Sequence, residues 1–307
     1  MLSLLVFFAL FGVFITQYVP LWMSQNENQY SNDAQASLEE LKQYVDDQAI
    51  FGIPHTYAVP FTLSSQGIPL FAQPTQGSLS YFSGGCSKGF VQNGSPVSPS
   101  ACSFQSLSYT SGVSPQNVTL YAATDYLEMQ LPNRYYPSQN LFFEGDAVIV
   151  SQGGSHQWML VPPPLNISVS PPTGAPSNVT VTSSLVSLLG SSGSFSGQGT
   201  TDVYSTLLSN TNISSLHRFV SDNVSLNFTV TFRVGTHNPC AWWAFLNGLV
   251  TPASGVTVTL IPNVLPAATS CGSATGPTTQ LILVVQGVRF AQAYIGQTQI
   301  SVNSGSS

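Results

Sequence analysis

An uninterrupted apolar segment opens the chain over residues 1–19, where only Ser3, Thr16 and Gln17 are fully polar. Nineteen helical residues span roughly 28 Å, about the thickness of a bilayer's hydrocarbon core. We expect a helix surrounded by lipid or protein, because a helix that is apolar on all sides is not stable in water. The alternative is a secretory signal, which begins with basic residues and ends in small ones. Here the first cation is Lys42, and bulky residues follow the apolar run.

The pattern changes over residues 24–50, where apolar positions recur every three or four residues. They are Ala34, Leu38, Leu41, Val45 and Ala49 with Gln48. The charged residues Glu39, Glu40, Lys42, Asp46 and Asp47 are assigned to the other faces. This stripe predicts an amphipathic helix that continues the apolar segment. The combined helix is about 50 residues long, bends at Pro20 and ends at Gly52 and Pro54.

Beyond residue 51 the apolar positions alternate with polar ones, most clearly over residues 224–234. Further strands are expected at residues 118–122, 141–150, 157–161, 179–183, 256–261, 280–288 and 299–302. The segment SQGGSH indicates a hairpin connection between the strands at 141–150 and 157–161. Short strands separated by Gly and Pro favour antiparallel sandwiches. The predicted fold is therefore α+β, with a long N-terminal hydrophobic and amphipathic α-helix followed by a mainly antiparallel β-sandwich head.

A proline-rich tract, VPPPLNISVSPPTGAP at residues 161–176, suggests a boundary within the head, because proline is excluded from central strands. We expect an N-terminal helix over residues 1–50 and two β domains over residues 51–168 and 169–307. The alternative is one continuous sandwich whose edge this tract crosses.

Composition narrows the functional classes. The chain is 43% hydrophobic and only 6% charged, with a formal net charge of −6. Such a balance excludes nucleic acid as a partner, since phosphate binding requires clustered cations. Seven of the eighteen charged residues fall within residues 27–47, and the head is nearly uncharged. Few carboxylates mean little acid denaturation, so we hypothesise an acidic exterior; a secreted protein from a neutral habitat is the alternative.

The segments MLSLLVFFALFGVFITQYVPLW and SLEELKQYVDDQ, followed by a β-rich, Ser/Thr-rich head, resemble the archaeal type IV pilin and archaellin superfamily. Bacterial-type pilins carry Glu at the fifth mature position, whereas this chain has Leu5. The resemblance implies a subunit whose helix first lies in the membrane and then bundles with other copies in a helical filament. A chain that begins inside its apolar run is typical of one cut on the N-terminal side of that run. A short basic leader upstream of Met1 would favour the pilin route, and its absence would favour a membrane anchor.

The resemblance assigns polymerisation to the apolar residues of the first helical turns. They are Leu2, Leu4, Leu5, Phe7, Phe8, Leu10, Phe11, Val13, Phe14 and Ile15. Implied partners are other copies of the chain, the cytoplasmic membrane before assembly, and N-glycans. The implied location is an extracellular cell-surface filament.

Cysteine spacing predicts one disulfide in each half of the head, Cys86 with Cys102 and Cys240 with Cys271. Other pairings stay open. A zinc site is not expected, because the four cysteines lack the close paired spacing of zinc ligands. Motifs for N-glycosylation occur at Asn93, Asn117, Asn166, Asn178, Asn212, Asn223 and Asn227. Some of these asparagines are alternatively turn residues.

A search for catalytic chemistry finds little. The four histidines are isolated, and no nucleophile-elbow or phosphate-binding motif occurs in the Gly-rich run at residues 190–199, which is expected to be a flexible loop. Two carboxylate pairs, Asp125/Glu128 and Glu144/Asp146, have the residue types of a glycosidase acid and base. Surface turns or a contact with Arg134 explain them more simply. We expect no catalytic residue, cofactor or metal.

The sequence therefore predicts a structural subunit of an archaeal type IV pilus-like filament, polymerising through its N-terminal helix for adhesion or surface interaction. The alternatives are a membrane-anchored ectodomain that does not polymerise, an archaellum subunit and an exported hydrolase.

Overall fold

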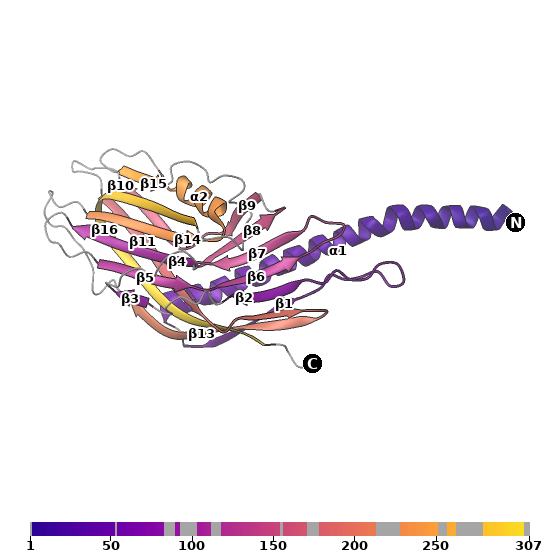
Figure 1. Ribbon diagram of the computed structural model, residues 1–307, viewed down its shortest axis with the longest axis horizontal. Coiled ribbons are helices and arrows are strands. Elements are labelled where there is room, and N and C mark those ends of the chain that lie inside the picture. The colour runs from indigo at the N-terminus through magenta and orange to yellow at the C-terminus, as the bar shows by residue number, and fades with distance from the viewer. Residues whose placement is uncertain are drawn as a thin grey trace.

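A computed structural model describes residues 2–52, 54–82, 90–92, 103–111, 118–153, 156–170, 178–212, 228–250, 257–261 and 279–303. It consists of a long N-terminal helix and a β-rich head (Figure 1).

The N-terminal helix, α1 (Leu2–Phe51), is continuous over 50 residues and contains Pro20. Its N-terminal part projects away from the head, and its C-terminal part lies along the sheets (Figure 1). The helix ends where Gly52 adopts a φ of 66° and its N–H donates to the Gln48 carbonyl at 3.0 Å. Left-handed glycine is a common helix terminator, so the predicted length and end of the helix are confirmed.

The described residues of the head form two sheets, both built largely from antiparallel strands. The first has the order β1 (Thr56–Thr62), β13 (Thr200–Asn212), β16 (Thr279–Asn303), β14 (Phe228–Thr236), β4 (Ser103–Ser111), β5 (Val118–Thr124), β3 (Phe90–Gln92). Three more strands join this sheet, β10 (Leu165–Ser170), β11 (Asn178–Leu189) and β15 (Thr257–Ile261). The second sheet has the order β12 (Gly193–Ser196), β2 (Ser78–Phe82), β6 (Tyr126–Leu131), β7 (Gln139–Glu144), β8 (Ala147–Gln152), β9 (His156–Val161). A short helix, α2 (Pro239–Gly248), contacts β9 and β16.

The α+β class and the mainly antiparallel pairing agree with the sequence prediction, and the parallel pair β11–β16 is an exception. The antiparallel pairing of β8 with β9 confirms the predicted hairpin. In the strand predicted over residues 224–234, residues 224–227 lie outside the described part, and β14 runs on to Thr236.

Two strand predictions and one loop prediction need correction. The single strand at 141–150 is a hairpin of β7 and β8, because Gly145 and Asp146 both adopt positive φ, 57° and 59°. Two consecutive positive φ values are the signature of a tight hairpin turn. The strands at 280–288 and 299–302 form one strand, β16, which pairs with β14 near one end and β13 near the other. The Gly-rich run at 190–199 contains β12, paired with β2.

The structure does not confirm two separate β domains. Strand β1 pairs with β13, β4 with β14, and β2 with β12, so strands from both sides of residue 168 share each sheet. These pairings fit the alternative of a continuous sandwich.

Among the described residues, two apolar cores lie within the head, and the second sheet contributes to both. Phe142 belongs to the core that surrounds Trp242, whereas its neighbour Phe143 belongs to the core that receives α1. The predicted stripe of α1 is buried in the latter core: Ala34, Leu38, Leu41, Val45 and Ala49. Successive residues of a strand point to opposite faces, so β7 is buried on both sides.

Candidate functional site

The apolar N-terminal part of α1 is exposed on every side. Five consecutive residues, from Leu4 to Phe8, are each more than half exposed, with Leu5 at 69%. Five residues exceed one helical turn, so no face of this segment is covered. Among the other predicted polymerisation residues, Leu10, Phe11 and Val13 are exposed, and Phe14 and Ile15 are half-buried.

This exposure is too costly for a helix in water. Fully burying one large apolar side chain stabilises a protein by about 1.5–3 kcal/mol, and eight such side chains between Leu4 and Val13 are 39–69% exposed. Because each is about half exposed, an environment that covers them gains on the order of 10 kcal/mol. By length and composition, α1 qualifies as a helix that can cross a membrane.

The helix enters the head at Val19 and Met23, which are buried, while Tyr18 and Trp22 remain exposed. The rings of Phe14, Tyr18 and Trp22 form an aromatic cluster, in which Phe14 stacks on Tyr18 with centroids 5.5 Å apart and meets Trp22 edge to face at 5.7 Å. Trp and Tyr are enriched where a protein passes from hydrocarbon to water. The aromatic cluster therefore marks the boundary between the apolar segment and the head.

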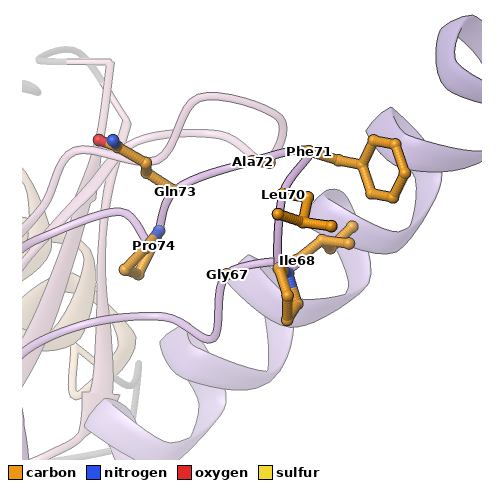
Figure 2. Close-up of a pocket in the computed structure, with 8 residues that line it drawn as sticks. Gly67, Ile68, Leu70, Phe71, Ala72, Gln73 and Pro74 are labelled. Carbon is orange, nitrogen blue, oxygen red and sulfur yellow. The ribbon is translucent and has the colours of Figure 1, made fainter.

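One loop of the head reaches back along the apolar segment. Residues 67–74 line a hollow of about 650 Å³, and Phe71 points from this loop toward α1 (Figure 2). The Phe71 ring centroid lies 6.2 Å from that of Phe11 and 6.5 Å from that of Phe14.

The buried carboxylate of Glu27 fixes the helix just after the aromatic cluster of Phe14, Tyr18 and Trp22. Glu27 is fully buried and accepts hydrogen bonds from three consecutive backbone N–H groups, those of Arg134, Tyr135 and Tyr136, at 2.7 to 3.1 Å. The Thr75 hydroxyl donates to the same carboxylate at 2.5 Å. Hydrogen bonds to an ionised acceptor are among the strong ones, so Glu27 anchors α1 to two loops of the head.

Two further polar contacts hold the helix along its length. Gln48 is buried, donates to the carbonyls of His55 and Ser205, and accepts from the Ser205 hydroxyl at 2.7 Å. Lys42 is also buried, although the sequence pattern places it away from the apolar stripe of the helix. Its ammonium pairs with Asp46 at 2.5 Å and with Asp146 at 3.7 Å. These contacts fix the rotation and depth of the helix within the head.

The two candidate carboxylate pairs are buried, so their interpretation as surface turn residues is wrong. Glu144 accepts hydrogen bonds from the hydroxyls of Ser103 and Thr236, from the His237 backbone and from the Asn238 amide. Burial alone raises the pKa of Glu144, but the contacts with His237, Ser103 and Asn238 outweigh it and lower the pKa below its usual value.

The other members of the pairs have different partners. Asp125 accepts a hydrogen bond from the Tyr81 hydroxyl at 2.8 Å, and burial raises the pKa of Glu128. Burial also raises the pKa of Asp146 well above its usual range, although the Lys42 ammonium opposes this shift. Arg134 contacts Glu27 through its backbone rather than through an ion pair with these acids.

The cluster of Ser103, His237 and Glu144 lacks the relay order of a nucleophilic triad. Both Ser103 and Glu144 contact the same ring nitrogen of His237, Nδ1, at 3.0 and 3.4 Å. In a triad the two partners bind opposite ring nitrogens. Within the described residues, no group of three His, Cys, Asp or Glu side chains is arranged to hold a metal ion.

Most of the predicted modification sites lie outside the described residues. Asn166 is exposed on β10. Asn178 and Asn212 lie at the ends of strands β11 and β13, whereas Asn93, Asn117, Asn223 and Asn227 lie outside the described residues. Cys240 is buried in α2 and disulfide-bonded. Because Cys86, Cys102 and Cys271 lie outside the described residues, the pairing stays a prediction.

Comparison with known proteins gives no relative: no family model, no curated protein and no solved structure matches this chain.

Proposed function

We propose that this protein is the structural subunit of an extracellular helical filament, similar to an archaeal type IV pilus, that polymerises through α1 for adhesion or surface interaction. The observation that carries the proposal is the combination of an apolar segment exposed on all sides with a head that holds the rest of the same helix through buried polar contacts.

Polymerisation gives the apolar segment a protein environment. The segment is exposed on every face, so it suits a bundle in which copies surround one another. Open helical assemblies form through head-to-tail contacts that do not close into a ring. Before assembly the same segment lies in the cytoplasmic membrane, and the filament replaces lipid contacts with contacts between helices.

The polar contacts suit a subunit that bears load. A pull on the head is transmitted to α1 through Glu27 near the boundary and through Gln48 near the helix end. The nearly uncharged head, with an exposed acceptor motif at Asn166, forms the outer surface of the filament and carries N-glycans.

Replacing Phe8 with aspartate tests the proposal. An unpaired charge in an apolar interface costs several kcal/mol, and the cost recurs in every subunit. We expect negative-stain microscopy of material sheared from cells to show filaments for the wild type and none for Phe8→Asp. The matched control is Ala36→Asp, which places the same charge at an exposed position of α1 inside the head. Filaments of normal length and number from Phe8→Asp contradict the proposal.

The second candidate is a membrane-anchored ectodomain that does not polymerise. It is favoured by the fact that α1 can cross a membrane by length and composition and by the aromatic boundary at Tyr18 and Trp22. In that case the wild-type chain stays in the membrane fraction and the sheared fraction contains no filaments.

A further inference from the structure

The loop at residues 67–74 presents apolar side chains to solvent at the edge of the head nearest the apolar helix. Leu70 at its tip is 101% exposed, and Phe71 is 42% exposed. No Asp, Glu, Lys or Arg occurs between Asp47 and Lys88, so the whole surrounding segment is uncharged. Figure 2 shows Leu70 and Phe71 on the side of the loop that adjoins α1.

The backbone at the tip of the loop is strained at Leu70. Leu70 adopts a φ of 69°, in the left-handed region that glycine and asparagine occupy far more readily. A leucine in that conformation with its side chain entirely in water does not stabilise the head. Strained backbone of this kind clusters at functional sites, so Leu70 is a candidate for contact with something outside the head.

The loop pairs part of its own backbone. The Ile68 and Ala72 N–H groups each donate to the other residue's carbonyl, at 2.9 and 3.0 Å, and the Phe71 N–H donates to the Ile68 carbonyl at 3.1 Å. Pro69 has no backbone N–H group. These features leave fewer backbone donors at the tip without a partner, which lowers the cost of entering an apolar environment.

The depth of the loop is set by its contacts with α1. Phe71 lies against Phe11 and Phe14, which precede Trp22 by three turns and two turns of helix. These contacts therefore lie roughly 12–16 Å along the helix from Trp22. When Trp22 lies at the level of the lipid headgroups, Phe71 and Leu70 lie at the level of the hydrocarbon chains.

We infer that the tip of this loop, from Pro69 to Phe71, inserts into the hydrocarbon of the leaflet on the side of the head, beside α1. The membrane-resident protein is then held by two apolar elements, α1 and the tip of this loop. The occupant of the surface is lipid. This role requires the helix to lie in a membrane and does not require polymerisation.

An environment-sensitive fluorophore at the tip tests the inference. The full chain carrying Leu70→Cys is labelled with a nitrobenzoxadiazole maleimide and reconstituted in phosphatidylcholine vesicles at high lipid excess. Leu70 is fully exposed, so the substitution leaves the fold intact, and labelled wild-type chain gives the background of the native cysteines. The matched control is Ile261→Cys, at an exposed position of β15 at the far end of the head (Figure 1).

We expect the label at position 70 to emit at shorter wavelength than the label at position 261, and to be quenched severalfold more by lipids spin-labelled on their chains. Identical emission and quenching at the two positions overturn the inference. A wavelength shift that disappears when more lipid dilutes the protein means that a second copy covers the loop, and this also overturns the inference. Because no filament is present, the outcome is separate from that of the polymerisation test.

Discussion

Replacing Glu27 with glutamine tests whether a single carboxylate anchors the helix to the head. The glutamine side chain has the same shape but presents one oxygen and one NH2 group to four donors. With the NH2 group in place of Oε2, the Tyr135 and Tyr136 N–H groups face another donor. With the NH2 group in place of Oε1, the Arg134 N–H faces a donor at 3.0 Å and keeps only the remaining oxygen, at 3.1 Å. The negative charge that strengthens the remaining hydrogen bonds is also lost.

The expected loss of stability follows from these contacts. A buried donor without an acceptor costs about 1–3 kcal/mol, and a hydrogen bond to a charged group exceeds a neutral one by about 1 kcal/mol. The free energy of unfolding should therefore fall by about 2–5 kcal/mol. For a domain of this size, that corresponds to a decrease in melting temperature of roughly 5–20 °C.

The assay is thermal unfolding of the full chain in detergent micelles, followed by near-ultraviolet circular dichroism. Glu39→Gln is the matched control, because Glu39 is an exposed carboxylate on the same helix and its replacement should change the midpoint by little. If Glu27→Gln melts within a degree or two of Glu39→Gln, the anchoring role of Glu27 is refuted.

Two further substitutions test how the helix is seated. In Gly296→Ala, the added Cβ would lie 2.7 Å from the Ala49 Cβ. Overpacking should therefore lower the free energy of unfolding, measured in urea, by about 1–3 kcal/mol. The control is Gly12→Ala, whose Cβ meets nothing within 4 Å, and equal stability of the two variants contradicts this expectation. Burial raises the pKa of Asp146, so its contribution to stability is complete below the unfolded-state pKa of about 3.9 and is lost as pH rises through the folded-state pKa. Asp146→Asn should therefore reduce the decline in melting temperature from acid to neutral pH, and parallel pH profiles for wild type and variant would refute this reasoning.

The helix could be predicted from sequence because its signals are local. The apolar run and the stripe from Ala34 to Ala49 depend only on spacing, and the structure buries that stripe. The turn at Gly145 and Asp146 lies within an apolar run, so the sequence pattern suggested one strand where the chain forms two. The signal in the sequence is the dipeptide Gly145–Asp146, because glycine and aspartate tolerate the positive φ values that the turn requires.

The anchoring residues could not be predicted, because their partners are distant and leave no pattern. Glu27 bonds to backbone N–H groups more than one hundred positions away, and any sequence supplies such groups. The sequence pattern places Lys42 away from the apolar stripe because it is charged. Its burial depends on Asp146, which a hairpin turn brings to within 3.7 Å of the Lys42 ammonium. The apolar residues of the loop at residues 67–74 are visible in the sequence, but only the fold places Phe71 beside Phe11 and Phe14.

Helical reconstruction by electron cryomicroscopy of material sheared from cells tests the central claim most directly. We predict a filament in which residues 2–15 of α1 pack against the same segment of neighbouring copies at the axis, with the β heads outside. A sheared fraction without filaments, with the intact chain retained in the membrane, contradicts the claim. A filament joined through its heads, with this segment exposed, contradicts it as well.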